Sequence, residues 1–244
     1  CLAGLLTALH FHRRGSAWSL AGLALALLSK ETAVVGIALW PLFLWLEGPR
    51  IPPFRKGSSR ARWLAAGGLV AAYLLLRGTV IGGFAQRDFR GGGWTGGLLL
   101  GTLSLWEYVK ILVWPLGLRV SRRQYIEDPW TSPWTLVGLG TAIVTALVLF
   151  YLWRRHRRAF FWAGWAPLTL LPVLGLAPTD TFVAERFLYV PLAGVGGVAA
   201  LLWDRFGAAG RRARGWARGV LAAALALWAG LSWAQVGVWR GELS

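Results

Sequence analysis

The segment AERFLYVP, residues 184–191, places polar side chains next to a long apolar run. Polar groups at membrane depth are energetically costly, so each is expected to have a structural or functional role. We expect this segment to open a helix, whose free N–H groups and positive dipole end favour anions. The planar guanidinium of Arg186 suits phosphate oxygens. Glu185 and Tyr189 have the i,i+4 spacing of one helical face, and Pro191 is expected to kink the helix. The alternative is an interfacial Glu185–Arg186 pair that merely ends a span.

A second polar segment, LSKETAV at residues 28–34, interrupts a stretch that is otherwise apolar. Ser29 or Thr32 could cap a second half-helix and leave Lys30 beside its positive N-terminus. Broken helices at membrane depth commonly mark binding sites, so this break also favours a bound anion. The alternative is a turn in which Lys30 and Glu31 neutralise each other.

The third segment, WEYVKILVWP at residues 106–115, has its polar residues on one stripe. Ser104, Glu107 and Lys110 fall on this stripe at helical spacing, and the aromatic residues between them suit a membrane interface. The pattern favours an amphipathic helix on the outer side of a membrane.

The composition predicts that these segments belong to a membrane protein. Of the 244 residues, 56% are hydrophobic and 15% charged, with 17 Trp and a mean hydropathy of +0.53. A soluble domain is about 25% charged, so an ordinary cytosolic enzyme, a disordered chain and a disulfide scaffold are excluded. The apolar runs are 1–12, 17–29, 31–46, 63–82, 98–118, 134–153, 160–177, 182–203 and 217–239. We therefore predict one all-α domain over residues 1–244, a polytopic transmembrane bundle of about eight or nine apolar helical segments.

Charge patterning predicts how the helices are oriented. The net charge is +16, and four basic clusters lie between the apolar runs, near residues 13–16, 48–62, 154–158 and 204–218. This clustering favours the positive-inside pattern over nucleic-acid binding, and we place all four clusters in the cytoplasm. Clusters on the same side of the membrane must be separated by an even number of crossings. Three apolar runs, 63–82, 98–118 and 134–153, lie between the second and third clusters. We therefore expect segment 98–118 to be interfacial or re-entrant on the outer side.

Cofactor motifs give no further assignment. Cys1 is the single cysteine, so neither a disulfide nor a Cys-rich metal site can form within the chain. We identify no Walker A loop, Rossmann fingerprint or HExxH motif and assign no cofactor or metal ligand, although a divalent metal stays possible. Met is absent and Cys1 opens inside an apolar stretch, so we expect the chain to be an internal part of a longer protein.

Three segments together resemble a known family. The segments appear in the order LALLSKETAVVGIALWPLFLW, WEYVKILVWPLGLRV and LLPVLGLAPTDTFVAERFLYVPLAG. The resemblance that they carry extends over most of the chain. They resemble the membrane module of the GT-C glycosyltransferases, the nearest being the transmembrane-and-tetratricopeptide-repeat O-mannosyltransferases and their bacterial relatives. The 244 residues contain no tetratricopeptide pattern. The acidic motif of the family's first outer loop has no counterpart either.

The resemblance implies a hexosyltransferase in the plasma (inner) membrane with an extracytoplasmic active site. It would move a sugar from a polyprenyl-phosphate carrier to a protein or glycan hydroxyl. Arg186 and Lys30 would bind the donor phosphate, whereas the catalytic base would lie upstream and is not assigned. Polar contacts with donor or acceptor would come from Glu185, Tyr189, Glu31, Arg119, Arg122, Arg123 and Tyr125. Alternatives are a transporter or flippase of lipid-linked saccharides, or a non-catalytic assembly subunit.

The predicted topology can be tested by cysteine labelling at Ser121, which lies between Arg119 and Arg122 in a segment that the topology places on the outer side. In a Cys1→Ser background, Ser121→Cys should react with a membrane-impermeant maleimide in intact cells. Labelling only after the cells are opened would place this segment in the cytoplasm and overturn the topology.

Overall fold

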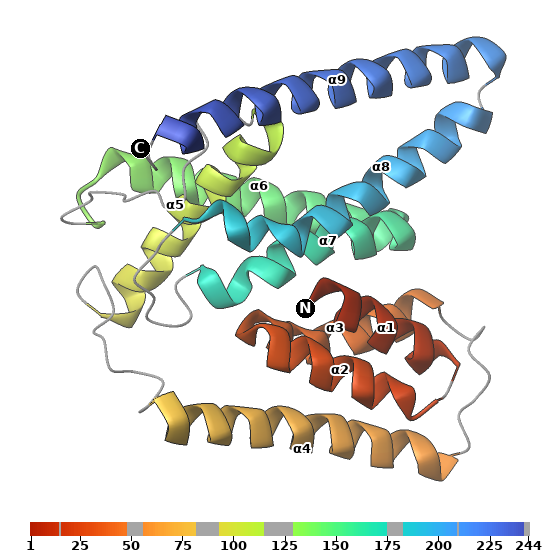
Figure 1. Cartoon of the computed structure of the whole chain (residues 1–244), viewed down its shortest axis with the longest axis vertical. Helices are drawn as coiled ribbons and strands as arrows, with labels where there is room; N and C mark the ends of the chain where they lie inside the picture. The colour runs from red at the N-terminus through yellow and green to blue at the C-terminus, as the bar shows by residue number, and fades with distance from the viewer. Residues whose placement is uncertain are drawn as a thin grey trace.

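The computed structural model describes residues 1–14, 16–47, 56–81, 93–114, 129–174, 183–208 and 210–241, and nearly all of them are helical (Figure 1). About 91% of these residues are in helices and none is in a strand, which confirms the all-α prediction. The α-helices are α1 Leu2–Arg13, α2 Trp18–Ser29, α3 Gly36–Glu47, α4 Lys56–Ile81, α5 Trp94–Val113, α6 Pro133–Arg155, α7 Arg157–Leu170, α8 Pro191–Ala208 and α9 Arg211–Gly241. Three short 3-10 helices, η1 Glu31–Val35, η3 Leu171–Val173 and η4 Glu185–Tyr189, connect some of them.

Four of the described helices are long and apolar enough to cross a membrane, which is fewer than the eight or nine segments predicted. They are Ala61–Val80 in α4, Trp94–Val113 in α5, Pro133–Arg155 in α6 and Arg211–Ala234 in α9. The other apolar runs are divided into shorter helices. Residues 17–46, for example, form two α-helices of 12 residues with η1 between them. Each is about 18 Å long, whereas a hydrocarbon core is about 30 Å thick.

The basic clusters come together at one end of the bundle. Figure 1 shows the α1–α2 turn, the start of α4, the α6–α7 turn and the α8–α9 turn at the same, right-hand end. Helix α4 ends and α6 begins at the opposite end, and α5 lies between these two helices in the sequence. This arrangement agrees with an interfacial or re-entrant α5, because α4 ends and α6 begins at the same end of the bundle. Because α5 also has the length and composition of a span, that assignment stays a prediction.

Small residues bring α1 and α2 into backbone contact. A methyl group added at Gly22 would lie 2.6 Å from the backbone nitrogen of Ala8, and one added at Gly4 would lie 2.7 Å from that of Ala26. Close approach through small residues is how helices associate when lipid surrounds them. The α1–α2 pair therefore packs on its glycines, and its buried leucines join one core with α3, α4 and α7.

The long helices α4, α6 and α9 instead present apolar side chains outward. Only 11% of the span window is buried in α4 and in α6, and none of it is buried in α9. Large apolar residues such as Leu75, Ile143 and Leu225 are exposed on these helices. Their surfaces match lipid rather than water, because an exposed apolar area of this size would be unusual in a soluble monomer.

The close α1–α2 contact predicts a difference between two glycine substitutions. Gly22→Ala should lower the free energy of unfolding by about 1–3 kcal/mol, because its methyl group meets backbone that cannot rotate away. Gly67→Ala on α4 is the control, since nothing lies within 4 Å of a methyl group there. Thermal unfolding of both variants in detergent measures the difference, and equal stability would contradict the packing.

Candidate functional site

Two polar segments predicted from the sequence meet in the structure. Lys30 Nζ donates a hydrogen bond of 3.2 Å to the carbonyl oxygen of Arg186, 156 residues further along the chain. The same Nζ lies 4.8 Å from the centroid of the Phe187 ring, and the Arg186 guanidinium carbon lies 5.4 Å from that centroid. We call this group the Lys30–Phe187–Arg186 cluster. It gathers two cations on one aromatic ring, so an anion bound between them would meet charge from two distant segments.

Lys30 reaches the cluster because the chain breaks at its position. Its backbone is extended, with φ −165° and ψ 135°, and its N–H donates to the Ala26 oxygen at the end of α2. Ser29 Oγ donates to the Leu25 oxygen at 2.6 Å, and η1 has no side-chain cap. The prediction that Ser29 or Thr32 caps a half-helix is therefore wrong, because Ser29 bonds back into α2 and Thr32 is buried without capping η1.

The motif at 184–191 forms a 3-10 turn followed by a helix rather than one kinked helix. Residues Glu185–Tyr189 make η4, in which the Phe187 N–H donates to the Ala184 oxygen, and α8 starts at Pro191. Pro191 lacks an N–H and its fixed φ suits a first helical position, so it opens α8 and does not kink it. A five-residue turn has too few aligned peptides for a helix dipole. The capacity to hold an anion therefore rests on the two cationic side chains.

The 3-10 geometry also changes which side chains are neighbours. Side chains at i and i+3 eclipse in such a turn, so Glu185 aligns with Leu188 and not with Tyr189. Glu185 and Leu188 both line one cavity, whereas Tyr189 is 72% exposed. The predicted shared face of Glu185 and Tyr189 is therefore wrong.

Buried aromatic side chains hold both ends of η4. Tyr108 on α5 is fully buried, and its hydroxyl accepts a 3.3 Å hydrogen bond from the Ala184 N–H. Trp165 on α7 is also fully buried, and its Nε1 donates at 2.8 Å to the Val190 oxygen. These bonds fix the turn that carries Arg186. Sequence reasoning assigned Tyr108 to an interfacial aromatic set and did not single out Trp165, because nothing local distinguishes it among 17 tryptophans.

An apolar cavity lies beside η4. Its volume is about 320 Å³, and its walls come from α5, η4, α8 and α9. Glu185 and Ser232 are its polar lining residues, and the rest of the lining is Ile111, Leu112, Leu188, Leu192, Val195, Trp228 and Leu231. A pocket of this composition suits a hydrocarbon chain with a small polar group near one end.

The stripe on α5 forms a local ion pair. Lys110 Nζ lies 2.5 Å from a Glu107 carboxylate oxygen and 5.5 Å from the Trp106 ring centroid. Ser104 is buried and donates to the Leu100 oxygen. The ion pair and the Trp106 contact fit an amphipathic helix, but Ser104 and Tyr108 are fully buried, so the predicted polar stripe and interfacial aromatic set face the protein in part.

The other predicted site residues are not placed. Arg119, Arg122, Arg123 and Tyr125 lie outside the described residues, as does the side chain of Glu31. Within the described ranges no group of three or more His, Cys, Asp or Glu could hold a metal ion. Comparison with known proteins adds no assignment, because no family model, no curated protein and no solved structure matches the chain.

The hydrogen bond between Tyr108 and Ala184 predicts a cost for its removal. Tyr108→Phe leaves the buried Ala184 N–H without this acceptor, which should lower the free energy of unfolding by about 1–3 kcal/mol. Tyr151→Phe on the exposed face of α6 is the control and should change stability by less than about 0.5 kcal/mol. Thermal unfolding in detergent measures both, and a neutral Tyr108→Phe would show that the bond does not hold η4.

Proposed function

We propose that the chain belongs to an integral membrane glycosyltransferase of the GT-C type that uses a polyprenyl-phosphate-linked sugar. The observation that carries the proposal is the meeting of Lys30 and Arg186 on the Phe187 ring, beside an apolar cavity. A polyprenyl phosphate has the matching parts, an anionic head and a long hydrocarbon chain. The resemblance of the segments around Lys30 and Arg186 to this superfamily supports the same assignment.

The proposed chemistry requires cations at the leaving group. An acceptor hydroxyl attacks the anomeric carbon of the donor sugar, the bond from that carbon to the phosphate oxygen breaks, and polyprenyl phosphate leaves with additional negative charge. Arg186 and Lys30 would stabilise that charge through fixed hydrogen-bond donors. The hydroxyl proton would go to a carboxylate acting as general base, which we leave unassigned. Glu185 would orient Arg186 or bind a sugar hydroxyl.

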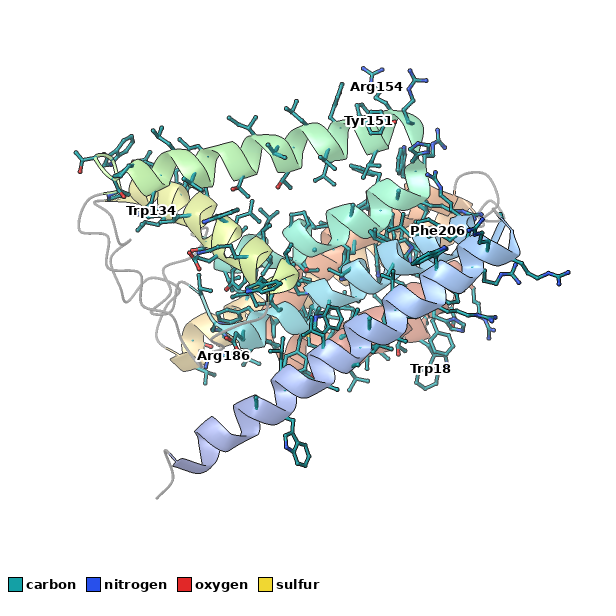
Figure 2. All side chains as sticks on the ribbon, turned by 90° about the horizontal axis from the view of Figure 1, so that it is seen from above. Trp18, Trp134, Tyr151, Arg154, Arg186 and Phe206 are labelled. Carbon is teal, nitrogen blue, oxygen red and sulfur yellow. The ribbon has the colours of Figure 1, made fainter. Side chains whose placement is uncertain are left out.

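The length of α8 supports an extracytoplasmic position for the site. Helix α8 is not one of the four candidate spans, but its 18 residues separate η4 from the basic α8–α9 turn by about 27 Å. It connects η4 with the basic α8–α9 turn, and Figure 2 shows Arg186 at the end of the bundle opposite Arg154 and Phe206. If the basic end is cytoplasmic, as the positive-inside pattern predicts, the Lys30–Phe187–Arg186 cluster faces the other leaflet.

A transporter or flippase of lipid-linked saccharides is the second candidate. The break between α2 and α3 meets the break before α8, and interrupted helices of this kind line the central sites of transporters. The two candidates differ in their product. An enzyme yields a glycosylated acceptor and free polyprenyl phosphate, whereas a flippase leaves the donor intact.

The phosphate role of Arg186 can be tested by binding. Undecaprenyl phosphate should bind the full-length protein at least about tenfold more weakly after Arg186→Ala, because a charge-assisted hydrogen bond is lost. Lys30→Ala should weaken the same ligand, and sugar transfer by Arg186→Ala should be lost. Arg14→Gln, an exposed residue of the α1–α2 turn at the opposite basic end, is the matched control and should leave binding and transfer unchanged.

Binding of undecaprenol distinguishes the loss of a phosphate contact from a change in packing around the hydrocarbon chain. It lacks the phosphate, so wild type and Arg186→Ala should bind it equally. If Arg186→Ala bound undecaprenyl phosphate as tightly as wild type does, the proposed phosphate role would be rejected. The glycosyltransferase assignment would be rejected if the donor were consumed without a glycosylated product, or if it moved intact between leaflets. Neither result would contradict phosphate binding by Arg186.

A further inference from the structure

Nine exposed arginines lie on two neighbouring turns at the basic end of the bundle. Within residues 150–160 and 204–218, leaving out residue 209, the structure describes a single acid, Asp204. The arginines are Arg154, Arg155, Arg157, Arg158, Arg205, Arg211, Arg212, Arg214 and Arg218. We call this surface the arginine end. Such an excess of like charge repels itself unless anions gather over it.

The two turns are held together. Arg205 Nη2 on α8 lies 3.5 Å from Nδ1 of His156 in the α6–α7 turn. Arg214 Nη2 on α9 donates at 2.8 Å to the Gly207 oxygen at the end of α8. These contacts make the α6–α7 turn and the α8–α9 turn one surface, and Figure 2 places Arg154 and Phe206 at the same end of the bundle.

Aromatic rings support several of these guanidinium groups. The Arg154 guanidinium carbon lies 5.1 Å from the Phe150 ring centroid and 5.2 Å from the Trp153 centroid. The Arg157 carbon lies 5.1 Å from the Trp45 centroid at the end of α3. A ring over the face of a guanidinium leaves its N–H rim able to bind oxygen atoms, and the rim matches a phosphate. Stacking also reduces the side-chain freedom that is lost on binding.

The position of the arginine end favours a lipid phosphate over other anions. Helix α6 ends at Arg155 and the α9 span begins at Arg211, so the arginines mark the ends of two apolar helices. Tyr151, Phe206 and Trp216 are exposed in the adjoining turns, as aromatic residues are where a membrane meets water. Arginine clusters immediately beside a span are typical of acidic lipid recognition.

We propose that the α6–α7 and α8–α9 turns together form a binding site for acidic phospholipid headgroups. Guanidinium rims from both turns contact the headgroup phosphate, whose negative charge no ammonium group offsets in an acidic lipid, and the exposed aromatic residues pack on the glycerol and acyl region. This site lies at the end of the bundle opposite the Lys30–Phe187–Arg186 cluster, and it stands whether or not the chain transfers sugars.

Native mass spectrometry with two lipids that differ in headgroup charge tests the site. The full chain in detergent is titrated with dioctanoyl phosphatidylglycerol or dioctanoyl phosphatidylcholine. Wild type should bind phosphatidylglycerol in preference, and Arg205→Gln should reduce this preference about fivefold, the effect of one cation near an acidic membrane surface. Arg158→Gln, an exposed residue of the other turn, should reduce it similarly and serves if Arg205→Gln does not fold.

Arg77→Gln is the matched control, because it removes one positive charge near the end of α4 that lies opposite the arginine end. Its lipid preference should equal that of wild type. Equal losses in Arg77→Gln and Arg205→Gln would mean that net charge alone attracts the lipid, and a wild type without preference would likewise overturn the site. If an RNA oligonucleotide displaced phosphatidylglycerol and bound more tightly, the surface would be a nucleic-acid site and the proposal would be wrong.

Discussion

The hydrogen bond from Lys30 to the Arg186 carbonyl is the contact on which the arrangement of the site depends. It joins a break in the first half of the chain to a turn in the second half, and both cations share the Phe187 ring. The bond is possible because α2 ends with an extended residue and because Tyr108 and Trp165 fix the two ends of η4. The two like charges repel each other, so the hydrogen bond, the shared ring and the fixed turn are what keep them close.

The sequence predicted the helical class, the break at Lys30 and the polar character of residues 184–191, because each has a local signature in hydropathy and charge. It did not predict that Lys30 and Arg186 meet, since no local pattern encodes a contact across 156 residues. The conformation of η4 was predicted wrongly because Pro191 was read as a kink within a helix, whereas the structure places it at a helix start. Local signals therefore located the polar groups, but packing by α5 and α7 decided their geometry.

Helix lengths also could not be predicted from local sequence signals alone. Hydropathy alone predicts that residues 17–46 contain two membrane-spanning segments. The polar residues at 29–32 instead divide this stretch into two helices of 12 residues, each too short to cross a bilayer. These short helices are stabilised by each other and by α7 through a shared core, while α4, α6 and α9 contact the surroundings over most of their surface. The chain thus combines an inner group of short helices with an outer set of long ones.

The small buried surface of α9 affects how the cavity beside η4 could open to the lipid. Trp228, Leu231 and Ser232 of α9 form one wall of that cavity, although no residue in the span of α9 is buried against the protein. Because no side chain in this span is buried, moving that part of α9 away from α8 would break little packing and would open the cavity wall toward lipid.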